Sequence, residues 1–77
     1  MTRYYVVSDP DNVPLCLLRR VARPDGLVDE ALRRDLRWHP TDRFAVNARN
    51  GEYEIEEIPA ERADAIADRW RAAWLAR

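Results

Sequence analysis

Few side chains in this sequence could act as a nucleophile or as a general base. Cys16 is the only cysteine and His39 the only histidine, and the Ser and Thr hydroxyls are those of Thr2, Ser8 and Thr41. Nucleophilic catalysis needs a nucleophile beside its base. Cys16 lies in an apolar run, which predicts an inert, buried thiol, and the position of His39 indicates a loop or a strand end. We therefore expect no catalytic activity.

The sequence also lacks the residue spacing that holds a metal ion or a phosphate group. One Cys and one His cannot supply the four ligands of a zinc site. Residues 9–12 look like the first positions of a calcium loop, but the Gly and Glu that close such a loop are missing, and Asp11 and Asn12 indicate a turn. Gly26 and Gly51 are the only glycines, which excludes a glycine-rich phosphate loop. We expect no metal and no cofactor.

Arginine supplies all 13 basic residues, against 14 acidic ones, for a formal net charge of −1. This balance argues against a nucleic-acid-binding module, whose surface is normally basic, although a local patch remains compatible with it. The candidate patch on the N-terminal segment consists of Arg3, Arg19, Arg20 and Arg23, beside Tyr4 or Tyr5. A sheet that displays Arg and aromatic side chains can hold single-stranded nucleic acid. The alternative, which we favour, is that these arginines face solvent or pair with the acidic residues of segment 52–56.

Three residues near the C-terminus are candidates for a protein-binding surface. Trp70 and Trp74 lie four residues apart, and Leu75 follows them. Tryptophan and arginine are enriched at protein–protein contacts. Either both tryptophans face a sheet as part of the core, or Trp74 and Leu75 extend past it and meet a partner or a second copy. Trp38 has the same two interpretations.

A second candidate surface is acidic. Glu52, Glu54 and Glu56 alternate with Tyr53 and Ile55, which predicts a half-buried strand over residues 52–58 with an acidic solvent face. If this strand lies at the edge of a sheet, its charges would also prevent edge-to-edge pairing.

The elements that position these residues begin with a hairpin. Residues 3–8 are aromatic and β-branched on both faces, which predicts a central strand. Residues 9–12 have turn chemistry, and a second strand follows over residues 13–23, with Pro14 at its start. We predict an antiparallel hairpin over residues 3–23.

Residues 27–39 allow two interpretations. Helix propensity favours one helix over residues 27–37, whereas the flanking turns favour two strands, 27–34 and 36–39, that meet near Arg34 and Asp35. We favour the strands. A short helix follows to residue 48 with Thr41 as its cap, and Asn50 and Gly51 end it.

The clearest helix begins after Pro59. Its apolar residues recur at helical spacing on one stripe: Ala63, Ile66, Ala67, Trp70, Ala73 and Trp74. We therefore predict that residues 1–77 form a single α+β domain, with a small, mostly antiparallel sheet of three to five short strands and a C-terminal amphipathic helix packed on one face.

These features predict a small protein–protein interaction or regulatory module without catalytic activity, which binds another protein or its own copy as a homodimer. A nucleic-acid-binding module is the alternative.

The lone cysteine and the lack of a secretory-signal pattern favour the cytoplasm. No apolar run approaches the about 18 residues that span a bilayer, so we expect no membrane contact. Arginine without lysine is typical of a GC-rich bacterial genome.

Overall fold

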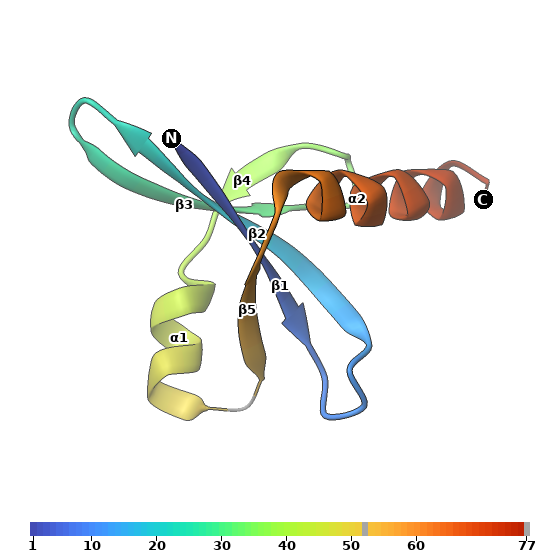
Figure 1. Ribbon diagram of the computed structural model, residues 1–77, viewed down its shortest axis with the longest axis horizontal. Helices are drawn as coiled ribbons and strands as arrows, with labels where there is room; N and C mark the ends of the chain where they lie inside the picture. The colour runs from blue at the N-terminus through green and yellow to red at the C-terminus, as the bar shows by residue number, and fades with distance from the viewer. Residues whose placement is uncertain (52, 77) are drawn as a thin grey trace.

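Five antiparallel strands form one sheet in the order β4-β3-β2-β1-β5, and a helix lies on each side of it (Figure 1). The computed structural model describes residues 1–51 and 53–76. Its elements are β1 (Thr2–Ser8), β2 (Pro14–Arg23), β3 (Gly26–Leu32), β4 (Trp38–Pro40), α1 (Arg43–Asn50), β5 (Glu54–Ile58) and α2 (Ala60–Leu75). The predicted α+β class, the antiparallel sheet and the C-terminal helix on one face are confirmed.

The predicted N-terminal hairpin is the pair of β1 and β2, in which Tyr5 lies opposite Leu18. Its turn is stabilised by Asp9, whose Oδ1 accepts hydrogen bonds from the backbone N–H groups of Asp11 and Val13, both at 2.9 Å. Asn12 has a φ of 64°, a left-handed conformation that asparagine adopts more readily than most residues. The turn residues therefore fix the register of the hairpin.

Segment 27–39 forms two strands, so the helical alternative is wrong. β3 pairs with β2, and β4 pairs with β3 but begins two residues later than predicted, at Trp38. The delay comes from the turn between them. There the N–H of Leu36 donates to the carbonyl oxygen of Arg33 at 2.9 Å, and Leu36 itself has a φ of 65°.

The short helix α1 begins one residue later than predicted and ends two residues later. The N-cap of α1 is Asp42, without a side-chain cap hydrogen bond, so the prediction of Thr41 as the cap is wrong. The side-chain oxygen of Thr41, one residue earlier, accepts a hydrogen bond from the N–H of Arg43 at 3.2 Å. Gly51 ends the helix in a left-handed conformation, with its N–H donating to the carbonyl oxygen of Asn47 at 2.7 Å.

The sheet carries a core on each face. On one face, Val6, Leu17, Leu32 and Ile58 pack against Ala63 and Ile66 of α2. On the other face, Val7, Leu18 and Ala31 pack with Phe44 of α1. Consecutive residues of β1 and β2 are therefore buried on opposite sides. The sequence predicted the helix on the first face but did not place α1 on the second.

Candidate protein-binding groove

The arginines of β2 are held by acidic residues of the neighbouring strand β3. On the α2 side of the sheet, Arg19 Nε lies 2.8 Å from Glu30 Oε1. The Arg19 guanidinium lies 4.5 Å from the ring centroid of Trp38, and Tyr4 meets the same ring edge-on at 6.1 Å. This arginine is therefore neutralised by a carboxylate and covered by aromatic rings.

A matching cluster occupies the α1 side of the sheet. Arg20 forms two hydrogen bonds with Asp29, at 2.7 and 3.2 Å, which raise the pKa of its guanidinium above the ordinary value. The guanidinium lies 4.6 Å from the Phe44 ring centroid, and Tyr5 contacts that ring edge-on at 4.9 Å. Both clusters tie strands β2 and β3 together and place an aromatic ring over the ion pair.

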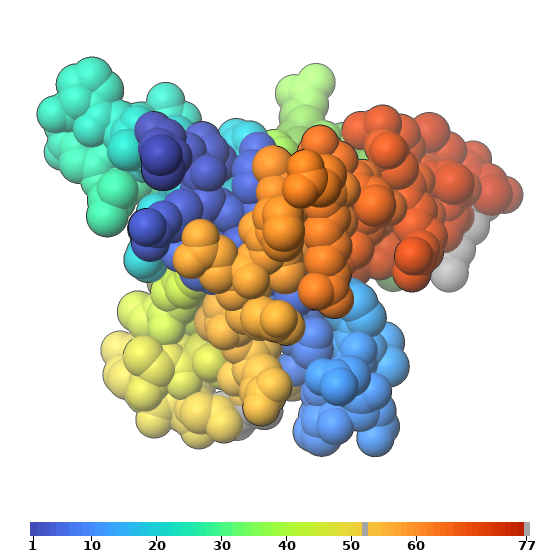
Figure 2. Space-filling view, in the orientation of Figure 1, coloured from blue at the N-terminus to red at the C-terminus, as the bar shows by residue number. Residues whose placement is uncertain are grey.

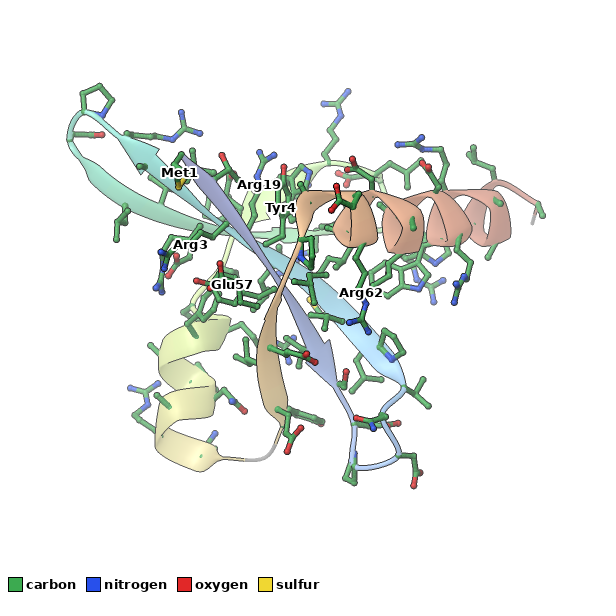
Figure 3. The ribbon with its side chains drawn as sticks, in the orientation of Figure 1. Met1, Arg3, Tyr4, Arg19, Glu57 and Arg62 are labelled. Atoms are coloured by element: carbon green, nitrogen blue, oxygen red, sulfur yellow. The ribbon has the colours of Figure 1, made fainter. Side chains whose placement is uncertain are left out.

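The four arginines of the candidate nucleic-acid patch do not converge on one surface. Arg19 and Arg20 lie on opposite faces of the sheet, and Arg23 is exposed where β2 ends. Arg3 lies beside Glu57 (Figure 3), and its Nε is 3.8 Å from Glu57 Oε2. Arginines of the patch thus pair with carboxylates, as expected. The carboxylates belong to β3 and to Glu57, whereas the predicted ones belonged to segment 52–56.

The predicted acidic strand is β5, which begins at Glu54, so Tyr53 lies before the strand and not in it as predicted. Among the strands of the described residues, β5 lies at the edge of the sheet and pairs with β1. Glu54 and Glu56 are exposed, and neither forms an ion pair with any residue in ranges 1–51 and 53–76. Glu52 falls outside the described residues. The edge strand therefore presents unpaired negative charge.

The two C-terminal tryptophans differ in their surroundings. Trp70 packs against the core on the α2 face, whereas Trp74 lies one turn further along and stacks on Trp70, with ring centroids 5.7 Å apart. Both remain half-buried, and Leu75 beside them is exposed. Figure 1 shows the reason: the C-terminal half of α2 projects past the sheet.

A groove of about 370 Å³ opens beside the stacked tryptophans. We call it the tryptophan groove. It is lined by β2, the end of β3 and the turn after it, α1 and α2, through Pro14, Leu15, Cys16, Leu32, Arg33, Arg34, Arg43, Trp70 and Trp74. Leu15 is a half-exposed apolar residue near the start of β2, beside the register shift in its pairing with β1.

Positive charge surrounds the apolar part of the groove. Arg34 places its guanidinium 6.0 Å from the ring centroid of Trp74. Within the described part of the chain, Arg33, Arg34 and Arg43 form no ion pair with a carboxylate. Sequence reasoning found the tryptophans but missed these arginines and Leu15. The one local signal was that Arg33 and Arg34 directly follow a buried strand end.

The Cys16 thiol lies in the wall of this groove and is half-buried. Burial raises the pKa of the Cys16 thiol, against the opposing effect of Arg43 and Arg33. A raised pKa leaves less thiolate at any pH below it, so iodoacetamide should alkylate folded Cys16 slowly. We expect the rate to rise with pH around a midpoint above that of the same chain unfolded in urea.

The raised pKa of the Cys16 thiol also makes the stability of the fold depend on pH. Because the folded pKa exceeds the unfolded pKa, the stabilising contribution is present below the ordinary thiol pKa and is lost as pH rises through the folded value. An alkylation midpoint equal to or below that of the unfolded chain would show that the thiol is not desolvated. Substitution of Cys16 by Ser provides the unreactive control.

His39 belongs to a separate cluster at the opposite edge of the sheet from β5. Its Nε2 lies 2.8 Å from Asp35 Oδ2. The hydrogen bonds with His39 and with the backbone N–H of Arg37 lower the pKa of the Asp35 carboxyl. Across residues 1–51 and 53–76, no three His, Cys, Asp or Glu side chains are grouped to hold a metal ion.

Comparison with known proteins adds no relative. Searches with this chain matched no protein-family model, no curated protein and no solved structure. Neither α1 nor α2 is long and apolar enough to cross a membrane, over the residues that the structure describes. The functional argument therefore depends on the tryptophan groove and the charges around it.

Proposed function

We propose that this protein is a small interaction or regulatory module, without catalytic activity of its own, that binds a protein through the tryptophan groove. The observation that carries the proposal is the stacked pair of Trp70 and Trp74 beside arginines that have no carboxylate partner among the described residues. Tryptophan and arginine are the residues that most often dominate binding energy at protein interfaces.

Two physical features favour this use of the groove. The two rings already stack on each other in the free chain, so a partner that covers them need not bring them together. The unpaired guanidinium groups give an apolar surface a charge preference, which selects an acidic partner.

The lone, unbridged Cys16 suits a reducing compartment, so we place the module in the cytoplasm.

The nucleic-acid alternative has less support. Arg19 and Arg20, half of its candidate patch, are held by Glu30 and Asp29. An arginine whose charge is already paired gains less from a phosphate group than a free one. We therefore treat nucleic-acid binding as an outcome that the test must distinguish.

The test is a capture experiment with matched baits. Wild type, Trp74→Ala and Leu27→Ala are immobilised and incubated with host extract, in parallel samples with and without nuclease treatment. Leu27 is an exposed leucine in β3 and does not line the groove, so its variant is the control. We expect protein partners, quantified by mass spectrometry, to bind wild type and Leu27→Ala and to fall at least about tenfold with Trp74→Ala, a loss of about 1.4 kcal/mol.

Equal capture by all three baits would contradict the proposal. Loss of all captured material after nuclease treatment would point instead to nucleic acid, and steep weakening by salt would accompany that result.

A further inference from the structure

We infer that the tryptophan groove accepts the acidic edge strand β5 of a second copy of this chain, and that a two-fold dimer results. The inference rests on the proposed function and names its partner. In such a dimer the groove of each copy meets β5 of the other, so one pair of surfaces is used twice.

Charge complementarity is the first argument. The groove has unpaired positive charge at Arg33, Arg34 and Arg43, and β5 has unpaired negative charge at Glu54 and Glu56, among the described residues of both surfaces. The net charge of the whole chain is only −1, so two copies do not repel each other strongly.

The open edge of β5 is the second argument. Figure 2 shows β5 uncovered on the front of the molecule, between α1 and the β1–β2 turn. Pairing β5 with β5 of another copy would bring glutamates against glutamates, which disfavours that contact. The basic groove removes this repulsion, because it offers each glutamate an opposite charge.

Tyr53 provides the third argument, because it supplies an aromatic group next to the acidic residues. Its backbone is held on both sides by Asn47: Tyr53 N–H donates to Oδ1 at 3.0 Å, and Asn47 Nδ2 donates to the Tyr53 carbonyl oxygen at 2.8 Å. Tyr53 is exposed. The segment that begins at Tyr53 thus presents an aromatic ring followed by carboxylates, which matches tryptophans flanked by arginines.

The test is charge reversal with complementation, read as solution mass by sedimentation equilibrium. One variant is Arg33→Glu/Arg34→Glu and the other is Glu54→Arg/Glu56→Arg; all four positions are exposed. We expect wild type to approach twice 9.1 kDa as its concentration rises, and each variant alone to stay near 9.1 kDa. An equimolar mixture of the two variants should recover the dimer, because every reversed charge then meets its opposite.

Two controls accompany the mixture. Arg23→Glu/Arg49→Glu reverses exposed arginines outside the groove and should dimerise like wild type. Raising the salt from about 0.05 M to about 1 M should weaken the wild-type dimer at least about tenfold, because the Debye length falls below the distance between neighbouring charges. Circular dichroism verifies that each variant is folded.

A wild type that stays monomeric at every concentration would overturn the dimer, as would variants that dimerise alone or a mixture that stays monomeric. If the wild type is monomeric while capture of another protein still depends on Trp74, this inference fails and the proposed function stands. If capture is also independent of Trp74, both fail.

Discussion

Replacing Leu17 with alanine is expected to lower the free energy of unfolding by about 2–5 kcal/mol. Leu17 is 0% exposed and lies in β2, in the core beneath α2. A domain of 77 residues has a total stability of roughly 4–12 kcal/mol, so this single change removes a large part of it. Urea denaturation followed by circular dichroism measures the loss.

Leu15→Ala is the matched control for that prediction. Leu15 lies two residues earlier in the same strand, but it is 49% exposed and lines the groove. We expect a loss of less than about 1 kcal/mol from this variant, together with weaker partner binding. Equal losses from both variants would mean that the groove wall belongs to the core.

Glu30→Gln is the second substitution with a large expected effect. It removes the negative charge that faces Arg19 and leaves the guanidinium half-covered by Trp38 without a counter-ion. Breaking a buried ion pair from one side costs about 3–5 kcal/mol, and partial exposure of Arg19 together with the remaining amide oxygen reduces this to about 2 kcal/mol.

The equivalent change on the other face provides the comparison. The side chain of Asp29 is 26% exposed, against 11% for Glu30, so Asp29→Asn should cost only about 1 kcal/mol. In the double variant Arg19→Met/Glu30→Gln, part of the lost stability should return, because no unpaired charge remains. Urea midpoints for the three variants test the order, and an Asp29→Asn loss as large as that of Glu30→Gln would contradict it.

Local sequence predicted the hairpin and the C-terminal helix because their signals are local. The first turn is stabilised by residues within it, through the Asp9 side chain and the left-handed backbone of Asn12. Gly51 likewise ends α1 by its own left-handed conformation. The apolar stripe of α2 follows helical spacing and buries Ala63 and Ile66 as expected. Neither inference needs a residue far along the chain.

Segment 27–39 was ambiguous because its strand state is fixed by distant residues. Asp29 and Glu30 are adjacent in sequence, yet they turn to opposite faces to reach Arg20 and Arg19 of β2. Helix propensity is a local property, so it does not reveal those partners on β2. The tryptophan groove was missed for the same reason, since its walls come from four separate elements and the turn after β3.

The most direct measurement is the free energy of unfolding of Trp74→Ala. It tests whether Trp74 contributes to partner binding and not to the stability of the core. The comparison with wild type is made by urea denaturation at concentrations low enough for both chains to be monomeric. Trp74 lies outside the buried core clusters, so we predict a loss of stability below about 2 kcal/mol, with partner binding weakened at least about tenfold. A loss of about 3–5 kcal/mol, typical of a core tryptophan, with unchanged binding would contradict the claim.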